Sequence, residues 1–408
     1  MKKTLMSLSL ILIVVLALTG CYEWPDPIWN PDDTGLPTPT ITGVDVTTLM
    51  GGIDNITITG TGFGDVKEEV LVYFKKGTTV GRGRTLTATN TQLVVEAPAT
   101  YSDSLEIWID RRGCFEYAKD TTNLITINAG IKSLPIISTS PLIKVGINEN
   151  GDIIVAQGSN QSVISVTVDD SISTIPGVAF SNSLNILSLR TKGTDIYYTL
   201  REYLVKYDGA LTRFKVNANK ENCVDFAFAD NNKVYIVGNG FIYSADDVLA
   251  SSTLALDDTD YNFTKCDFYD GKLYVASTYQ GDDTLKTNEK AIMAYPVNTD
   301  GTLGTAETII NWTDDFAGSI ISNITFDADD RMYVATLTRT PIYVIEPVAG
   351  SYADGNISLL YPVLLNDNII SMRWETGDYM AFLAEDNDAM RTVYRLNMLE
   401  TASASYIP

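Results

Sequence analysis

The stretch GGIDNITITGTGFGD at residues 51–65 contains five glycines, three of them at positions 60, 62 and 64. A phosphate-binding loop places such glycines between a strand and a helix, so that free backbone amides face the anion. Here the strand-like run NITIT precedes the glycines, and KEEVLVYFKKG after them resumes the two-residue alternation of a strand. No Lys-Ser/Thr pair follows to complete a nucleotide loop. The glycines therefore predict no nucleotide site, and the residues around them decide the fold.

The sequence on both sides of this stretch predicts a domain of strands alone over residues 38–128. Short alternating runs rich in β-branched residues are separated by Gly, Pro and Asn, which indicates about seven strands and no helix. The runs are ITGVDV, NITITG, VLVYF, RTLTAT, QLVVEAP, LEIWID and NLITIN. This length and strand number are typical of an immunoglobulin-like sandwich, although the Cys…Trp…Cys pattern of antibody domains is absent from the sequence.

Four motifs in this segment resemble the IPT/TIG family. They are Pro39-x-Ile41, the Gly51-Gly52 pair, the run Ile56–Gly64 and the run Thr91–Pro98 (TQLVVEAP). The family's usual proline before the double glycine is missing from VDVTTLMGG. The resemblance implies that Gly60, Gly62 and Gly64 form a tight turn at a strand edge, with Phe63 packed inward.

Residues 131–408 carry a degenerate repeat of two apolar strands joined by a tight Asp, Asn or Gly turn, usually followed by a third strand. The centres of the second strands are 43, 38, 39, 59 and 47 residues apart, which is typical of the blades of a β-propeller. Six repeats predict six blades, and the pattern resembles the NHL and related six-bladed families. A strand near 131–138 is expected to complete the last blade; a stack of further sandwich domains is the alternative architecture. The six centres are Ile154, Tyr197, Tyr235, Tyr274, Tyr333 and Met380.

The N-terminus predicts export and a lipid anchor. Lys2 and Lys3 precede the apolar run LMSLSLILIVVLAL, which has the length of a secretory signal and not of a membrane-spanning helix. Residues 18–21, LTGC, resemble the lipobox of bacterial lipoproteins, which implies a signal peptide at 1–20 and lipidation of Cys21. By the sorting pattern of enterobacterial lipoproteins, Tyr22 in place of an aspartate after the cysteine favours the outer membrane. We also expect the protein to be exposed at the cell surface. Residues 21–37 are rich in proline and predict an extended tether.

Composition excludes several classes of protein. The chain has 51 acidic and 29 basic residues, a formal charge of −22, which argues against binding nucleic acid. It has no histidine, so it can hold no Ser-His-Asp triad, Cys-His dyad or His-ligated zinc. No catalytic residue and no metal ligand is predicted. Cys223 and Cys266 are expected to be buried thiols, and the sequence does not decide whether they form a disulfide.

Acidic turns such as FADNNK and DADDRM lack the spacing of a calcium loop and match the needs of tight hairpins. The sequence does not decide whether the central tunnel holds a calcium ion. Some six-bladed hydrolases bind calcium there, but no set of ligands for it is evident in this sequence. We predict no other cofactor.

A long loop, STYQGDDTLKTNEKA at 277–291, suggests a ligand site at the face where second strands end. The predicted ligand-binding residues are Tyr279, Gln280, Arg339, Arg373 and Trp374. Lipoproteins that resemble this layout occur in glycan-capture systems, so the leading hypothesis is a non-catalytic, membrane-anchored glycan-binding protein with the sandwich as spacer. The alternatives are a scaffold that binds an outer-membrane transporter or another envelope protein, and a cation-dependent propeller hydrolase or lyase.

Overall fold

The computed structural model describes residues 35–99, 102–136, 141–158, 162–178, 186–216, 221–246, 248–286, 289–316, 319–338, 341–361, 365, 367–374 and 379–398. These residues form two compact units, one holding the chain up to Leu49 together with Asp54–Ile127, the other holding Met50–Ile53 and the chain from Asn128. The predicted signal peptide, Cys21 and most of the tether lie outside the described residues. Within the part of the chain that the structure describes, no helix is long and apolar enough to cross a membrane.

The first unit is a sandwich of eight strands, one more than the alternation predicts. Strand β5 joins its two layers, because Thr79–Gly83 pair with β4 and Arg84–Thr89 pair with β6. The strand order is β1-β3-β6-β5-β4-β7-β8-β2. The strands are β1 (Thr40–Val44), β2 (Thr48–Met50), β3 (Asn55–Thr61), β4 (Val70–Lys76), β5 (Thr79–Thr89), β6 (Gln92–Glu96), β7 (Ser102–Arg111) and β8 (Ala118–Asn128).

The glycine-rich stretch forms the turn that the family resemblance implies. Gly62 and Gly64 have positive φ angles of 79° and 82°, a conformation that favours glycine. Phe63 is fully buried in the sandwich core, and its amide donates to the carbonyl of Asn90 at 3.2 Å. No α-helix follows the turn: residues Lys67–Glu69 make one short 3-10 turn before β4 begins.

Asp120 at the start of β8 makes the stability of the sandwich depend on pH. Burial alone would raise the pKa of its carboxyl, but hydrogen bonds from Thr122 and Asn123 outweigh this and lower the pKa to about 2. Because the folded pKa lies below the unfolded one, the stabilisation is present above pH 4 and is lost as the pH falls towards 2. We expect Asp120→Asn to cost about 2 kcal/mol at pH 6 and progressively less between pH 4 and pH 2. Urea unfolding of the wild type and of Asp120→Asn across this pH range measures the difference in their free energies of unfolding. A difference that does not change with pH would contradict the prediction.

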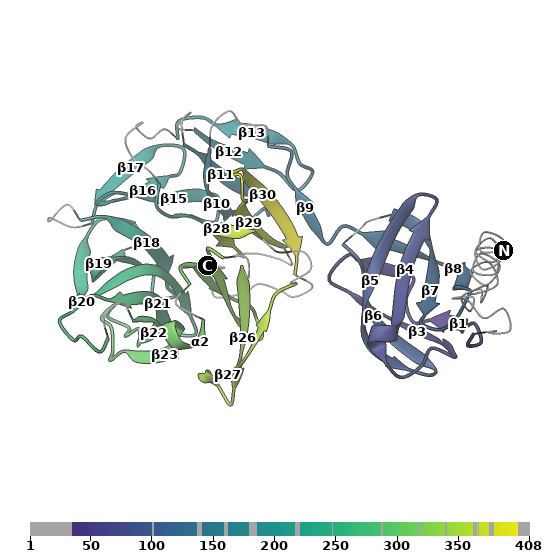
Figure 1. Ribbon diagram of the computed structural model, residues 1–408. Helices are drawn as coiled ribbons and strands as arrows, with labels where there is room; N and C mark the ends of the chain where they lie inside the picture. Colours follow the sequence, from purple (N-terminus) through teal and green to yellow (C-terminus); the bar gives the residue numbers. More distant parts are fainter. Residues whose placement is uncertain are drawn as a thin grey trace, which may run out of the picture. The chain divides into compact units, whose positions relative to one another are not determined.

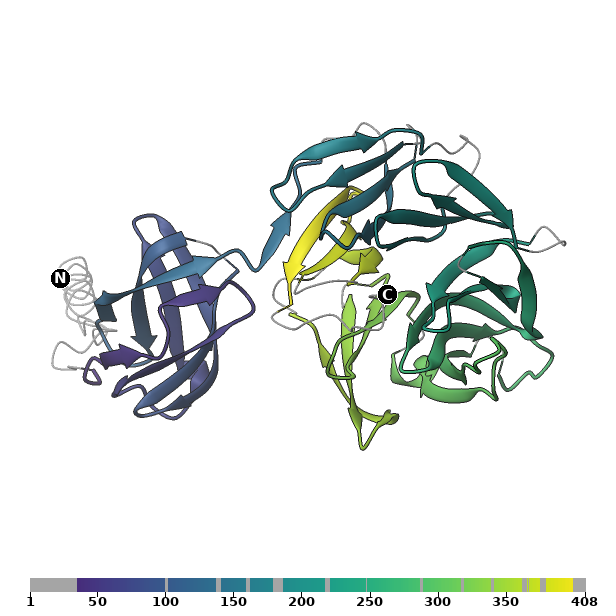
Figure 2. The ribbon, with the colours of Figure 1, turned by 180° about the vertical axis from the view of Figure 1, so that it is seen from behind.

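The second unit consists of small antiparallel sheets arranged around a common centre, as the repeat predicts (Figure 1). The first two sheets are β10 (Leu142–Ile147) to β13 (Ile172–Ile175) and β14 (Leu189–Lys192) to β17 (Leu211–Lys215), each with its strands in chain order. The strands between their ends are β11 (Ile153–Gln157), β12 (Ser162–Val166), β15 (Asp195–Leu200) and β16 (Tyr203–Tyr207). The architecture is that of a propeller (Figure 2).

The third sheet has six strands, so the described residues form five sheets and not six separate blades. Strand β20 (Ser252–Tyr269) runs from the repeat centred at Tyr235, where it pairs with β19 (Lys233–Asp246), into the repeat centred at Tyr274, which joins the two repeats. The end of β19 pairs with the start of β20, whose later half pairs with β21. The other strands of this sheet are β18 (Cys223–Phe228), β21 (Lys272–Tyr279), β22 (Lys290–Pro296) and β23 (Glu307–Asn311), followed by the short helix α2 (Trp312–Asp315).

The last two sheets confirm how the ring closes. Strand β9 (Ile131–Ser133), from the start of this unit, pairs with β30, its last described strand, as expected for a strand near 131–138. The fourth sheet is β24 (Ile321–Phe326), β25 (Met332–Thr336), β26 (Ile342–Val348) and β27 (Ser351–Leu359). The fifth is β28 (Asn368–Arg373), β29 (Tyr379–Glu385), β30 (Arg391–Asn397) and β9.

The centres of the second strands are buried, which explains the recurrent tyrosines as core residues. The exposed fractions of Tyr197, Tyr235, Tyr274 and Tyr333 are 2%, 0%, 4% and 2%. Cys223 and Cys266 are buried free thiols in different core clusters, so the structure contains no disulfide between them.

Candidate functional site

Two of the predicted ligand-binding residues hold the 277–291 loop in place. Tyr279 is buried at the end of β21, and its hydroxyl accepts a hydrogen bond from the amide of Asp283 at 3.2 Å. Gln280 is exposed, but its side-chain amide donates to Asn239 Oδ1 at 2.8 Å and to the carbonyl of Thr259 at 3.1 Å. Both side chains therefore fasten the loop to strands of their own sheet.

The other predicted residues lie elsewhere. Trp374 follows β28 and is fully buried, with its ring 5.2 Å from that of Tyr333 in a perpendicular arrangement. Arg373 at the end of β28 is 4% exposed and points towards the propeller axis. Arg339 lies outside the described residues. Arg373 and Trp374 thus belong to the interior of the propeller.

Arg373 links several of the innermost strands. Its Nη1 donates to Asn323 Oδ1 on β24 at 2.9 Å, and its Nη2 donates to Ser188 Oγ beside β14 at 3.2 Å. The same Nη2 is 3.7 Å from Asp225 Oδ1 on β18. One guanidinium therefore contacts residues of three other sheets, which shows that the first strand of each converges on one axis.

A second ion pair crosses the axis. Arg190 on β14 donates through Nη1 to Asp267 Oδ1 at 2.8 Å and through Nη2 to the carbonyl of Cys266 at 2.6 Å, both on β20. Arg190 and Asp267 are 2% and 1% exposed. Burial lowers the pKa of Lys144 on β10 and of Lys265 on β20, and the charges of Asp225 and Arg373 act on both ammonium groups.

We call Lys144, Arg190, Asp225, Lys265, Asp267 and Arg373 the axial cluster. Four of its members are cationic and two are carboxylates. A divalent cation prefers several oxygen ligands and is repelled by neighbouring positive charge. The residues of the axis therefore do not fit calcium, and across the described residues no group of three or more Cys, Asp or Glu side chains could hold a metal ion.

The aspartates of the acidic turns accept hydrogen bonds from backbone amides of the same turn. Asp327 Oδ1 accepts from the amides of Asp329 at 3.0 Å and Arg331 at 2.8 Å. Asp386 Oδ1 accepts in the same way from the amides of Asp388 and Met390, both at 2.9 Å. Such bonds stabilise tight hairpin turns, in agreement with the interpretation made from the sequence.

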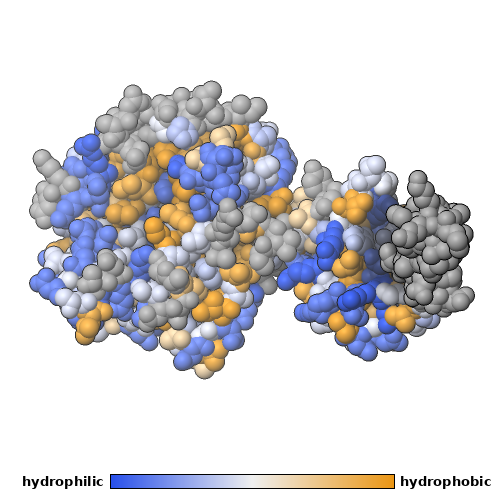
Figure 3. All heavy atoms as spheres, viewed as in Figure 1, coloured by the Kyte–Doolittle hydropathy of each residue, from blue (hydrophilic) through white to orange (hydrophobic). Residues whose placement is uncertain are grey.

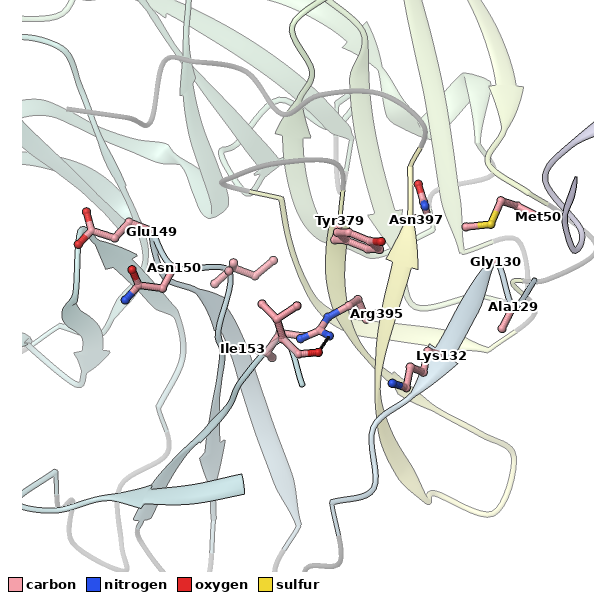
Figure 4. Close-up of a pocket in the computed structure, with 13 residues that line it drawn as sticks. Met50, Ala129, Gly130, Lys132, Glu149, Asn150, Ile153, Tyr379, Arg395 and Asn397 are labelled. Carbon is pink, nitrogen blue, oxygen red and sulfur yellow. Dashed lines mark hydrogen bonds between the residues drawn. The ribbon is translucent and has the colours of Figure 1, made fainter. Parts of the chain in front are cut away.

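A pocket of about 530 Å³ lies in the propeller unit, between the fifth sheet and the first (Figure 4). Its volume is within the range of small-molecule sites. We call it the Tyr379 pocket. Its lining residues, all in the second unit, are Met50, Ala129, Gly130, Lys132, Ile147, Glu149, Asn150, Gly151, Ile153, Val168, Tyr379, Arg395 and Asn397.

Strand register places four of these residues on one wall. Tyr379 on β29 pairs directly with Asn397 on β30, and Arg395, two residues before Asn397, pairs with Lys132 on β9. Residues two apart on a strand, and residues directly opposite each other, share a face of the sheet. Tyr379 is 47% exposed, so much of its ring is free to meet a ligand.

The opposite wall comes from two turns of the first sheet. Glu149, Asn150 and Gly151 form the turn between β10 and β11, and Val168 lies in the turn between β12 and β13. Arg395 donates to the carbonyls of Val168 at 3.0 Å and Thr167 at 3.2 Å, which fixes its guanidinium across the pocket. An ion pair with Asp170 holds Lys132. The pocket thus combines an aromatic ring with fixed polar and charged groups.

The Tyr379 pocket is on the face of first-to-second-strand turns, whereas the sequence suggested the face where second strands end. Its residues come from six separate stretches of the chain, so no local motif marks it. One signal was present: Met380 is an inward strand centre, so alternation points the adjacent Tyr379 outward, an unusual position for an aromatic ring.

Comparison with known proteins supports the two parts of the fold. Residues 39–126 match the IPT/TIG domain family, which confirms the resemblance read from the motifs. A comparison with curated protein sequences gave no match.

Among solved structures, a Bacteroides thetaiotaomicron protein of unknown function is similar over 91% of this chain and 100% of its own, with 13% identity and a TM-score of 0.50. An auxiliary nutrient binding protein from the same organism covers 88% of this chain and 97% of its own, with 10% identity and a TM-score of 0.47. A gluconolactonase from Xanthomonas campestris covers 65% and 89%, with 10% identity and a TM-score of 0.49. At these identities the first likeness concerns the fold alone, and the other two are too weak to support an argument about function.

Proposed function

We propose that this protein is a non-catalytic carbohydrate-binding lipoprotein of the bacterial envelope, in which the Tyr379 pocket holds the glycan and the sandwich acts as a spacer. The observation that carries the proposal is the wall on which the exposed ring of Tyr379 lies directly opposite Asn397. A flat ring matches the apolar face of a sugar, while a few polar groups fix its hydroxyls. Glu149 and Asn150 supply such groups from the facing turn.

The axial cluster argues against the cation-dependent enzyme. In that alternative a metal at the centre of the propeller would activate water or polarise the substrate. Here the centre holds two arginines and two lysines beside two paired carboxylates. On the face seen in Figure 3, hydrophilic residues are mixed with hydrophobic ones.

A glycan array followed by calorimetry on the purified mature protein tests the function. We expect a defined class of oligosaccharide to bind, and Tyr379→Ala to weaken that binding roughly tenfold, the equivalent of about 1.4 kcal/mol. Tyr117→Ala is a matched control, because Tyr117 of the sandwich is 48% exposed against 47% for Tyr379. An array without binding across plant, host and microbial polysaccharides would contradict the function. Binding that Tyr379→Ala leaves unchanged would contradict the site alone.

The anchor is tested separately at Cys21. We expect the wild-type chain, expressed in a bacterium with its signal peptide, to incorporate radiolabelled palmitate and to fractionate with membranes. Cys21→Ser should lose both properties, because several acyl chains are needed for a stable anchor. Cys114→Ser is the control, since Cys114 is a thiol of the folded sandwich. Labelling that persists in Cys21→Ser would refute the anchor.

A further inference from the structure

One end of the sandwich carries exposed apolar side chains on adjoining segments. They are Leu36, Val66 and Phe115, whose exposed fractions are 45%, 49% and 59%. We call these three residues the tip patch. Phe115 belongs to the loop at residues 112–117 that joins β7 to β8 (Figure 1), and Val66 lies between β3 and β4. Apolar side chains exposed singly are common, but a group of them on neighbouring segments indicates a contact surface.

Backbone hydrogen bonds join the segments that carry the patch. The amide of Leu36 donates to the carbonyl of Gly113 at 2.7 Å. The amide of Arg112 donates to the carbonyl of Glu69 at 2.8 Å, and the amide of Glu69 donates to the carbonyl of Val66 at 3.1 Å. The loop between β7 and β8 is therefore bonded to both of the other segments, and the folded sandwich presents the three side chains together.

Two glycines bring Leu36 and Phe115 into one surface. A Cβ atom at Gly35 would lie 3.1 Å from the ring of Phe115, and one at Gly113 would lie 3.2 Å from Cδ1 of Leu36. The φ angles of these glycines are 65° and 88°, a conformation that favours glycine. Each apolar side chain thus lies against the backbone of the other's segment, and together the two form a continuous apolar surface.

The chain enters the sandwich beside the tip patch. Gly35 is the first residue that the structure describes, and it lies 14 residues after Cys21, the proposed lipidation site. A chain of that length spans at most about 50 Å. A lipid anchor at Cys21 would therefore hold the patch close to the membrane, where a weak contact forms because the effective concentration is high. The place where the chain enters thus points to a membrane surface as the occupant of the patch.

The charges beside the patch favour contact through apolar side chains. The loop at 112–117 has one cation, Arg112, and one carboxylate, Glu116, and Arg112 Nη1 lies 3.7 Å from Glu69 Oε1. Attraction to anionic lipid needs an excess of basic residues, and the whole chain has a formal charge of −22. Phenylalanine and leucine side chains bury themselves at the boundary between headgroups and acyl chains. The patch therefore suits a zwitterionic phospholipid surface, and salt should not weaken the contact.

We propose that the tip patch lies on the phospholipid surface of the membrane that holds the anchor, and so limits how the sandwich tilts on its tether. The inference rests on the proposed lipidation of Cys21, and it gives the sandwich a second role beside that of a spacer. Three side chains bury too little apolar area to hold a protein on a membrane by themselves, so the anchor remains necessary for stable attachment.

Chemical coupling to vesicles tests the contact independently of natural lipidation. The chain from Cys21 onward is produced without acyl chains and with Cys114→Ser, so that Cys21 can be joined to a maleimide lipid in phosphatidylcholine vesicles. Cys223 and Cys266 are buried and do not compete. We expect hydrogen exchange over residues 112–117 to be roughly threefold slower in the coupled protein than in the free one, because bound lipid excludes water from the loop. Added sodium chloride should leave this difference unchanged.

Phe115→Ser separates contact from mere closeness to the vesicle. The variant removes the largest side chain of the patch, so the difference in exchange between coupled and free protein should disappear. Leu36→Ser is the second variant, in case the first does not fold, and should reduce the difference. Val80→Ser is the control, because Val80 is 50% exposed but pairs with Lys75 at the other end of β4. It should behave like the protein with an unchanged patch.

Three results would overturn the proposal. The first is equal exchange over residues 112–117 in coupled and free protein, and the second is slower exchange that Phe115→Ser and Leu36→Ser both retain. The third is a dimer of the free chain, seen by analytical ultracentrifugation and lost in Phe115→Ser, which would assign the patch to a second copy of the chain. Because the coupling is chemical, absence of palmitate on Cys21 would contradict the lipoprotein, whereas only the exchange result decides whether the patch contacts lipid.

Discussion

Asp225→Ala is expected to lower the free energy of unfolding of the propeller by about 3–5 kcal/mol, since it removes one partner of a buried charge pair. Asp225 is 1% exposed and accepts hydrogen bonds from the amides of Phe226 and Cys266. Its loss would leave those donors without an acceptor and Arg373 without its carboxylate at 3.7 Å. Denaturant unfolding, with hydrogen exchange measured by mass spectrometry over β18 and β20, reports the change where it arises.

Asp208→Ala is the matched control for this experiment. Asp208 also pairs with a cationic side chain, Lys206 at 3.2 Å, but it is exposed at the propeller surface. Exposed ion pairs contribute little because water and salt screen them, so this variant should unfold like the wild type. Equal stability of Asp225→Ala and Asp208→Ala would show that the axial carboxylate is not a structural centre of the fold.

Gly60→Ala is expected to destabilise the sandwich by about 3 kcal/mol, at the upper end of overpacking effects. A Cβ atom at this position would lie 2.0 Å from the carbonyl oxygen of Thr40 and 2.4 Å from the ring of Phe63. The first contact is with the backbone of the paired strand β1, so no side-chain rotation relieves it. Hydrogen exchange over β1, β3 and the turn at residues 61–65 should accelerate in the variant.

Gly43→Ala tests whether the effect is specific to position 60. Gly43 lies on β1, next to the same strand β3, but an added Cβ would meet only Thr59 Oγ1 at an ordinary 3.5 Å. This variant should therefore keep close to wild-type stability, and the propeller strands should exchange normally in both variants. A sandwich that tolerates Gly60→Ala as well as Gly43→Ala would show that this close approach does not exist in solution.

The sequence correctly predicted those parts of the fold that depend on short-range patterns of residues. Alternation and turn residues located the second strands, with Tyr197, Tyr235 and Tyr333 at buried centres. The motif around Phe63 predicted the sandwich, and the need for a ring to close predicted the pairing of residues 131–133 with the last described strand. Each of these follows from spacing along the chain or from a rule of ring closure.

The count of six separate blades is not confirmed, because it depends on where a strand ends between two repeats and not on the pattern inside a repeat. Strand β20 is long enough to pair with β19 of the third repeat and with β21 of the fourth, which joins the two repeats into one sheet. Likewise, the 277–291 loop was identified correctly as an expansion, but Tyr279 and Gln280 turn out to fasten it. Whether a polar side chain binds a ligand or another part of its own chain depends on which groups the fold places beside it.

By itself the sequence determined the class of the protein: a strand-rich chain with an IPT/TIG sandwich, a propeller of short repeats and no histidine for catalysis. These properties are local, because alternation, turn chemistry and composition act over a few residues. Only the tertiary structure decided which side chains meet. It brought Tyr379 opposite Asn397 and gathered four cations around the axis, since strand register and ring closure join residues separated by hundreds of positions.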